Sequence, residues 1–225
     1  MSSGLGHPRA HCRLTDSTNA RARELVGRGA PHGTVVTAAE QSAGRGRQGR
    51  TWSAPGGRAL LCSVVIREPS RLLPLVAGMA VAEVVGPKAR IKWPNDVLVD
   101  GRKVAGILVE GRPQERWAVV GIGLNVALRP EDFPPELRET AGTLDLEPGA
   151  IEPTLDALMA RLEHWTTSPA ESVLEAVRGR DALLGHHVRW AGGIGRGAGI
   201  DTDGRLRVAT ESGTVALDAG EVHLG

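Results

Sequence analysis

The residues best suited to chemistry lie in one short stretch, residues 44–52, which reads GRGRQGRTW. Its three glycines let the backbone approach a ligand closely, and successive backbone N–H groups in such a loop can bind an anion. Arg45, Arg47 and Arg50 add planar guanidinium groups that suit phosphate or carboxylate. The stretch lacks the Gly-Lys-Ser/Thr ending of a Walker loop. We therefore expect an anion site of another kind; the alternative is a disordered Arg-Gly segment that binds RNA.

A second candidate is Lys92 in the stretch KWPND. Pro94 disfavours the helical conformation at Trp93, so Lys92 is expected at the end of a strand with a fixed direction. A lysine on a rigid element is a point charge that can stabilise a reacting anion. Taken alone, an ordinary surface lysine would be the more common interpretation. Asn125, a polar residue near the end of the apolar run GIGLNV, is a further candidate for a ligand contact.

The composition of the 225 residues, 41% hydrophobic and 24% charged, is typical of a globular protein. No apolar run approaches the roughly 20 residues that cross a bilayer, and the N-terminus lacks the apolar core of a signal peptide. Cys12 and Cys62 are too few for a disulfide scaffold and have no metal-ligand spacing. We therefore expect a cytoplasmic protein without a membrane partner.

Charge is distributed unevenly along this nearly neutral chain. The net charge of +1 gives little general attraction to nucleic acid. Between Glu40 and Glu68, however, there is no acidic residue, and five arginines occur. Such a positive island favours a specific anionic ligand over a long polyanion.

The elements that must position these residues are predicted from apolar patterning. Apolar runs predict strands at 34–39, 60–66 and 117–126, and Asp100-Gly101 predicts a type I′ turn between strands within 90–111. Helices are expected after the N-cap types at 16–18, and at 71–85, 154–167 and 170–184. The first dozen residues are expected to be a loose tail. Together these elements predict an α+β fold, with a mostly antiparallel sheet and helices on one side.

Beyond Gly185 the sequence changes character. Short β-prone runs at 187–190, 197–201, 205–210 and 214–217 are separated by glycine or Asp-Gly turns. About forty residues of this kind predict a small β-barrel. We therefore expect two domains, residues 1–184 with the candidate site and residues 185–225 as the appendage.

Several stretches together resemble the biotin protein ligases. DSTN, AEQSAGRGRQGRTW, KWPNDV, KVAGILVEG and GIGLNV occur in the order and spacing of that family, from about residue 16 to residue 126 and more loosely to the C-terminus. The resemblance implies a catalytic core related to class II aminoacyl-tRNA synthetases, followed by a small barrel of the Src-homology-3 kind. It also implies a two-step reaction, in which biotin and ATP form biotinyl-5′-adenylate and biotin then passes to a lysine.

The resemblance also assigns roles to residues of this sequence. The biotin-binding set that it implies is Ser17, Thr18, Asn19, Gln41, Arg45, Gly46, Arg47 and Lys92. Arg50, Trp52 and Asn125 would contact the nucleotide, Trp52 against adenine and Asn125 near the nucleotide or its Mg²⁺. Lys92 and Arg47 would be catalytic. Mg²⁺ would be bound mainly through the ATP phosphates, with its protein ligands unknown.

Partners follow from the same resemblance. The acceptor would be a lysine of a biotin carboxyl carrier protein or domain, and a homodimer is possible. Many members carry a DNA-binding domain of roughly 60 residues before DSTN, whereas about 15 residues precede it in this sequence. We therefore expect no repressor function and no nucleic-acid partner. A lipoate ligase shares the fold and chemistry but would lack GRGRQGRTW, and a non-catalytic sensor is the alternative of another class.

Overall fold

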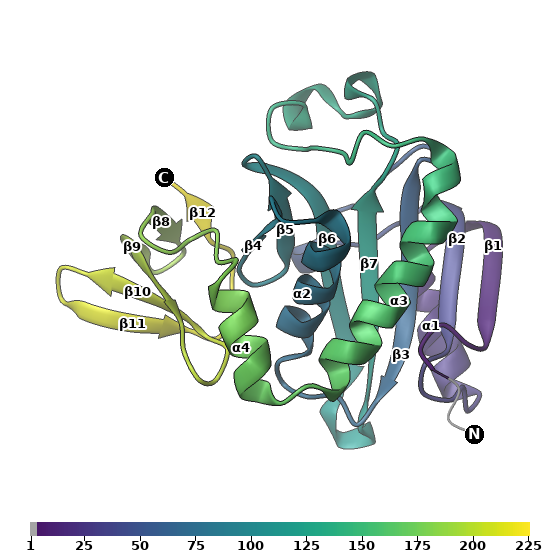
Figure 1. Cartoon of the computed structure of the whole chain (residues 1–225), viewed down its shortest axis with the longest axis horizontal. Helices are drawn as coiled ribbons and strands as arrows, with labels where there is room; N and C mark the ends of the chain where they lie inside the picture. The colour runs from purple at the N-terminus through teal and green to yellow at the C-terminus, as the bar shows by residue number, and fades with distance from the viewer. Residues whose placement is uncertain (1–3) are drawn as a thin grey trace.

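The computed structural model describes residues 4–225 and contains two sheets (Figure 1). The larger has seven strands in the order β1-β2-β3-β7-β6-β5-β4. In that order their bounds are β1 (Arg9–Thr15), β2 (Val35–Gln41), β3 (Ala59–Arg67), β7 (Trp117–Asn125), β6 (Arg102–Arg112), β5 (Asp96–Val99) and β4 (Arg90–Lys92). Only β1 and β2 pair in parallel; the other neighbours are antiparallel, which confirms the mostly antiparallel sheet.

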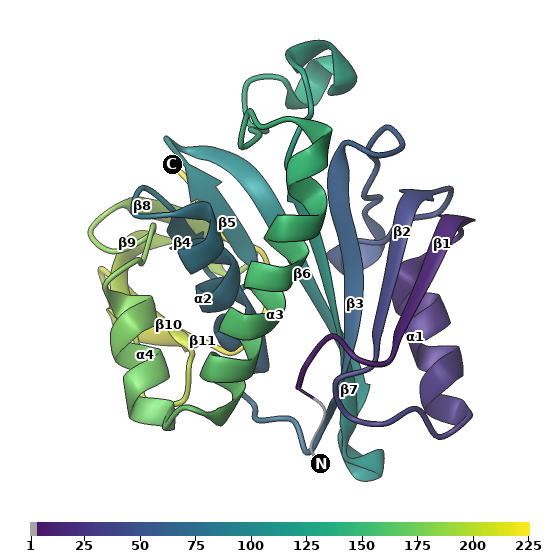
Figure 2. The same cartoon turned by 45° about the vertical axis from the view of Figure 1, so that its right-hand side comes forward.

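Helices cover both faces of this sheet. α2 (Leu73–Val85) and α3 (Ile151–Thr167) pack on one face, in front of the strands in Figure 1. α1 (Thr18–Gly27) lies on the other face, as the turned view in Figure 2 shows. There Ala22 and Val26 of α1 pack against Val36, Val65 and Val119. The expectation of helices on one side only is therefore wrong for α1.

The open part of the α1 face is where the candidate site can form. Residues of β7 alternate between the two faces, so Val120 and Ile122 enter the large core while Gly121 and Gly123 point to the α1 side. α1 covers only one end of this face. The remaining sheet surface is available to the loop between β2 and β3.

The second sheet is formed by the C-terminal residues. β8 (His187–Trp190), β9 (Gly193–Ile200), β10 (Leu206–Thr210), β11 (Gly213–Leu217) and β12 (His223–Leu224) pair antiparallel in the order β11-β10-β9-β8-β12. The expected β-rich appendage is thus present. The division at residues 184 and 185 stays a prediction, because side chains of both sheets share one hydrophobic core.

Two expected boundaries differ from the structure. Residues 9–12, expected in a loose tail, belong to the edge strand β1 and pair with β2. The helix expected at 170–184 is α4 (Ala170–Arg178) and ends earlier. After it, Ile91 N–H donates to the Arg180 carbonyl and Ala182 N–H donates to the Ile91 carbonyl, 2.7 and 2.9 Å. This pairing covers the free edge of β4. The residues after α4 therefore extend the sheet instead of continuing the helix.

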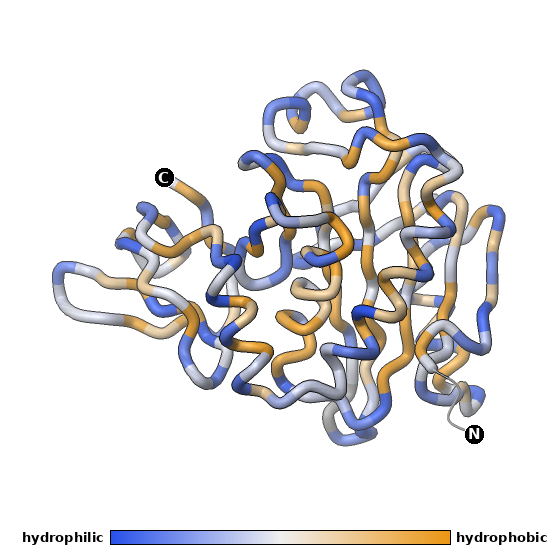
Figure 3. The backbone as a smooth tube through the Cα atoms, in the orientation of Figure 1, coloured by the Kyte–Doolittle hydropathy of each residue, from blue (hydrophilic) through white to orange (hydrophobic). Residues whose placement is uncertain are grey.

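Apolar residues concentrate in the central strands and the inner sides of the helices (Figure 3).

The predicted turn between β5 and β6 is confirmed, because Asp100 and Gly101 have φ of 48° and 78°. Within residues 4–225, no helix is long and apolar enough to span a membrane.

Candidate active site

One row of residues crosses the sheet on the α1 side. Lys92 pairs with Asp96, Asp96 with Gly106, and Gly106 with Gly123. Directly opposed residues of neighbouring strands point to the same face, so all four share one surface. Its centre has no side chains because two of the four are glycines. Lys92 stands at the edge of this glycine floor, which we define as Gly106 and Gly123.

The ring of Trp52 lies on the glycine floor. A Cβ at Gly123 would be 2.4 Å from Trp52 Cε2, and one at Gly106 would be 2.9 Å from Trp52 Cζ3. Any larger residue at either position would push the ring away. The two glycines of β6 and β7 therefore serve the close approach of an aromatic ring.

The ammonium group of Lys103 lies over the Trp52 ring. The Lys103 Nζ atom lies 5.7 Å from the ring centroid and 2.7 Å from Asp96 Oδ1. The buried indole N–H of Trp52 has no hydrogen-bond partner within residues 4–225. An unsatisfied buried donor costs about 1–3 kcal/mol. A ligand atom that accepts from this N–H, or that displaces the ring, would remove that cost.

The glycine-arginine loop, residues 44–52, folds back on itself above this surface. Trp52 N–H donates to the Gly44 carbonyl at 3.0 Å, and Gly46 N–H donates to the Arg50 carbonyl at 2.7 Å. At its tip, Gln48 has a φ of 55°. A cavity of about 840 Å³ lies between the loop and β6, bounded there by residues 108–110. This volume is in the range of pockets for small ligands.

Two loop arginines are held by residues outside the loop. Arg47 donates to Asn95 Oδ1 at 2.9 Å, and Asn95 Nδ2 in turn donates to the Ile107 carbonyl at 3.1 Å. Arg50 forms an ion pair with Glu221 of the C-terminal sheet. The loop is thus tied to the KWPND turn on one side and to the second sheet on the other.

Lys92 is half-buried, close to the residues that hold the two loop arginines. Burial lowers the pKa of its ammonium group below the ordinary value of 10.5. The positive charges of Lys103 and Arg50 also lower this pKa, while the carboxylates of Asp96 and Glu221 raise it. Lys92 therefore lies among charges of both signs in a partly desolvated place, unlike the ordinary surface lysine of the alternative interpretation.

At the other end of the site, Thr18 is bonded to Gln41. The backbone N–H and the hydroxyl of Thr18 donate to Gln41 Oε1 at 2.7 and 3.0 Å. Gln41 Nε2 lies beneath the loop, 2.8 Å from where a Cβ on Gly44 would fall. Ser17 is the N-cap residue of α1 and Gln41 ends β2 directly before Ser42 of the cavity lining, so the start of α1 and the end of β2 meet at a corner beside the cavity.

Asn19 is buried, and both ends of its amide have partners inside the protein. Its Nδ2 donates to Glu110 Oε2 at 2.8 Å and to the Leu108 carbonyl at 3.3 Å. The Ser63 hydroxyl donates to its Oδ1 at 2.6 Å. A Cβ at Gly121 would lie 2.1 Å from that oxygen. The structure thus gives Asn19 the role of fixing the start of α1 on the sheet.

Asn125 also forms hydrogen bonds that hold a neighbouring segment in place. Its Nδ2 donates to the Gly142 carbonyl at 2.8 Å, and its own carbonyl accepts from Leu144 N–H at 2.9 Å. These bonds hold the segment after β7. Contact of Asn125 with a nucleotide stays a prediction.

The structure brings most of the expected residues together around the loop and the glycine floor. Sequence reasoning did not single out Ser63, Asn95, Lys103, Glu110 and Glu221. Asn95 and Glu110 carried a signal, since both are polar residues within motifs already noted. Ser63 and Glu221 carried none, because their roles arise from pairing across strands and between sheets.

Comparisons with known proteins agree with this arrangement. Residues 11–126 match the model of the biotin/lipoate A/B protein ligase family, and residues 194–225 match that of the biotin protein ligase C-terminal domain. The biotin–[acetyl-CoA-carboxylase] ligase of Mycobacterium tuberculosis is 35% identical, over 93% of this chain and 86% of its own length. The bifunctional ligase/repressor BirA of Bacillus subtilis is 33% identical, over 94% and 72%. The Aquifex aeolicus biotin protein ligase in complex with biotin and ATP superposes with a TM-score of 0.84 at 27% identity, over 97% and 100%.

Proposed function

This chain belongs to the biotin/lipoate A/B protein ligase family and is an ATP-dependent biotin protein ligase, and we propose which of its residues carry the reaction. It forms biotinyl-5′-adenylate and then transfers biotin to a lysine of a biotin carboxyl carrier protein. The observation that carries the assignment of residues is that one loop links the cavity to the glycine floor. Residues 42–51 line the cavity opposite residues 108–110 of β6, and Trp52, the next residue, covers the floor at whose edge Lys92 stands.

We assign the uncharged end of biotin to the corner formed by Ser17, Thr18 and Gln41. This corner offers hydroxyl and amide groups, which can pair with the N–H and C=O groups of a ureido ring. Asn19 contributes by holding that corner in place, since its amide is already occupied by Ser63 and Glu110. Arg45 and Gly46 belong to the loop above the cavity.

The charged end of biotin then points along the surface toward Lys92. In the first step a biotin carboxylate oxygen bonds to the α-phosphorus of ATP, and the bond to the bridging oxygen breaks as pyrophosphate leaves. Both reacting groups are negative, so neutralising and positioning charge are the main demands. Lys92 and Arg47 can meet them together, because Asn95 holds the guanidinium of Arg47 next to the KWPND turn that carries Lys92.

The nucleotide base is assigned to the glycine floor and Trp52. Trp52 already covers that floor, and its unsatisfied N–H makes this ring position costly to keep. Arg50 lies toward the phosphates, where ATP would compete with Glu221 for its guanidinium.

Mg²⁺ fits this site as a companion of ATP. Among residues 4–225, no group of three or more His, Cys, Asp or Glu side chains could hold a metal ion. Mg²⁺ commonly keeps several waters and binds through substrate phosphates with one or two carboxylates. When bound, it supplies positive charge to the phosphates; the residues of the chain orient the carboxylate and exclude water.

In the second step the neutral amine of the acceptor lysine attacks the carbonyl carbon of the adenylate. A C–N bond forms, the C–O bond to AMP breaks, and the amine loses a proton to solvent or base. The family acts on biotin carboxyl carrier proteins. A homodimer, cytoplasmic residence and the lack of a nucleic-acid partner stay predictions from the sequence.

The test is transfer to a purified biotin carboxyl carrier domain. With biotin, ATP and Mg²⁺, we expect the protein to add the mass of one biotinyl group to the domain. Biotin-dependent exchange of pyrophosphate into ATP reports the first step alone. Lipoate in place of biotin is the matched control, and transfer of lipoate but not biotin would contradict the assignment.

A further inference from the structure

The turn between β9 and β10, residues 201–205, is stiffened by Asp201. Its Oδ1 accepts the backbone N–H groups of Asp203 and Arg205 at 2.8 and 2.9 Å, and its Oδ2 accepts Arg205 Nε at 2.7 Å. Burial raises the pKa of Asp201, but these hydrogen bonds outweigh it and hold the pKa below its ordinary value. The ionised form that makes the bonds is therefore the stable one at neutral pH.

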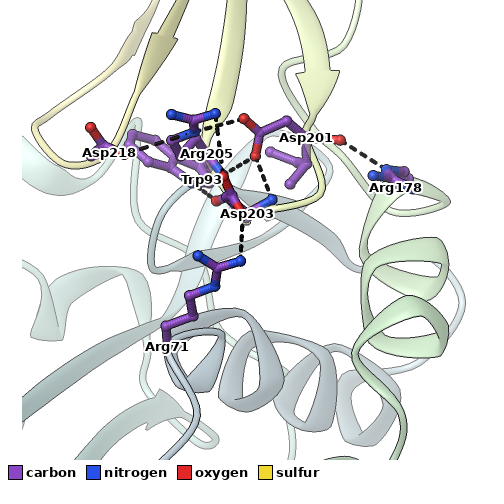
Figure 4. Close-up of polar contacts among 9 residues, drawn as sticks. Arg71, Trp93, Arg178, Asp201, Asp203, Arg205 and Asp218 are labelled. Atoms are coloured by element: carbon purple, nitrogen blue, oxygen red, sulfur yellow. Dashed lines mark hydrogen bonds and ion pairs between the residues drawn. The ribbon is translucent and has the colours of Figure 1, made fainter.

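Gly204 in this turn touches the large domain directly. Its φ is 80°, and a Cβ there would lie 2.6 Å from Leu72 and 3.2 Å from Leu75 at the start of α2. Arg71, one residue before Leu72, forms an ion pair with Asp203. The turn of the C-terminal sheet is thus docked on the N-terminal end of α2, as Figure 4 shows.

The Gly204 carbonyl accepts a hydrogen bond from the indole N–H of Trp93 at 3.0 Å. Trp93 is 3% exposed and follows Lys92 in the chain. A second link, from Arg178 Nε to the Ile200 carbonyl at 2.8 Å, ties α4 to the end of β9, directly before this turn (Figure 4). The C-terminal sheet therefore reaches within one residue of Lys92.

Lys92 needs such support because β4 is short. The strand has three residues and Lys92 is its last. Packing in an apolar core locates the Trp93 ring, but a hydrogen bond from its only polar atom fixes the rotation of the ring. The backbone that carries Lys92 is joined directly to that ring. Shifts of about 1 Å in a catalytic group can cost on the order of a hundredfold in rate.

We propose that Trp93 is a positioning residue for adenylate formation: its hydrogen bond to Gly204 lets the C-terminal sheet hold Lys92 in place. This inference rests on the proposed role of Lys92. It gives the C-terminal sheet a part in the first chemical step without any contact between that turn and a ligand.

The test compares two tryptophan variants by biotin-dependent pyrophosphate exchange. Trp93→Phe keeps most of the ring and removes the N–H. Trp165→Phe is the matched control, because Trp165 is 8% exposed and donates a similar bond to Glu83 at 3.0 Å, away from Lys92. We expect kcat to fall about tenfold or more for Trp93→Phe, within the range that small displacements cost. The control should stay within about twofold, and its KM for biotin should be unchanged.

A double-variant comparison separates positioning from simple loss of stability. In a Lys92→Ala background, Trp93→Phe should lower kcat no further, because the group that it positions is gone. The same fold loss in both backgrounds would overturn the inference, as would a normal kcat for Trp93→Phe alone. A normal rate for Lys92→Ala would instead refute the proposed role of Lys92, and with it the premise of the inference.

A second variant covers the case in which Trp93→Phe does not fold. Asp201→Asn slackens the turn that presents the Gly204 carbonyl and leaves Trp93 itself intact. Its matched control is Asp218→Asn, since Asp218 is also ion-paired with Arg205, at 3.8 Å, but accepts no backbone hydrogen bond of the turn. We expect a lower kcat for Asp201→Asn and an unchanged kcat for Asp218→Asn. Equal rates for the two variants would overturn the inference.

Discussion

Asn19 shows how a buried polar side chain can support a binding site by holding its neighbours in place. Its amide nitrogen donates to Leu108 and Glu110 and its oxygen accepts from Ser63, so a ligand that accepted from this nitrogen would have to break one of these bonds. Glu110 is itself paired with Arg23 of α1 at 3.3 Å. The corner that we assign to biotin is thus fixed by a buried network, and such networks are costly to disturb because each lost partner leaves another group unsatisfied.

Gly121→Ala tests this network from the sheet side. The new Cβ would lie 2.1 Å from Asn19 Oδ1, so Asn19 must move and its partners lose their bonds. We expect KM for biotin to rise about tenfold or more, equivalent to about 1.4 kcal/mol or more of binding free energy. Gly27→Ala, at the end of α1, is the control, since a Cβ there meets nothing within 4 Å.

The double variant Gly121→Ala with Asn19→Ala distinguishes the clash from the amide itself. It has room for the new Cβ, so we expect partial recovery of the thermal midpoint but no recovery of KM for biotin. Full recovery of biotin binding would contradict the positioning role of Asn19, because steric relief alone would then suffice.

At the scale of elements, a strand or turn could be predicted from the sequence where neighbouring residues alone determine it. The turn at Asp100-Gly101 and the strands flanking it were predicted because the residue types of a type I′ turn are a local requirement. β1 was missed although RAHCRLT alternates apolar and polar residues, because two of its three apolar residues, Ala10 and Cys12, are small and give a weak signal. Its strand state comes from pairing with β2 and from the two hydrogen bonds of Arg9 to Glu152, which lies 143 residues away.

The same distinction applies to the site. GRGRQGRTW and KWPND indicated the loop and Lys92 because those residue types are unusual in sequence. Three contacts depend on the tertiary structure and leave no local signal in the sequence. They are the hydrogen bond of Arg47 to Asn95, the ion pair of Arg50 with Glu221 and the packing of Trp52 on two glycines. The roles of individual residues were therefore less predictable than the location of the site.

The glycine-arginine loop is expected to exchange between open and closed forms. The loop has few contacts that hold it, and the partly exposed Arg50–Glu221 ion pair contributes little stability. We expect rapid trypsin cleavage after Arg45, Arg47 or Arg50 in the free protein and suppression by biotin with ATP. Mass spectrometry of the fragments would identify the sites. Equal protection with and without ligands would mean that the loop is closed from the start.

Glu221→Gln gives this experiment an internal comparison. Removing the negative charge weakens the tether from the C-terminal sheet, so cleavage of the free protein should become faster. With biotin and ATP bound, the phosphates replace Glu221 as the partner of Arg50, and protection should return to that of the unmodified chain. Glu211→Gln, an exposed substitution in the same sheet, is the control.

At the scale of the whole molecule, the two sheets share one interior. The large hydrophobic core contains residues of α2, α3 and the central strands together with the C-terminal Val188, Ile200, Leu206, Val208 and Val222. Arg180, between α4 and β8, donates to the carbonyls of Ala82, Gly86 and Ala89 at the end of α2. The segment that joins the sheets is therefore anchored rather than free.

A shared core predicts that the two parts unfold together. Scanning calorimetry should show one transition, with calorimetric and van't Hoff enthalpies nearly equal. Trp93→Phe removes a hydrogen bond worth about 1 kcal/mol, so it should lower the single midpoint by about 2–4 °C, the shift typical of a chain of this size. It should not split the transition, because the apolar contacts between the sheets remain. A separate early transition that involves only the C-terminal sheet would contradict this prediction. It would also mean that a sheet so loosely attached cannot hold Lys92 in place.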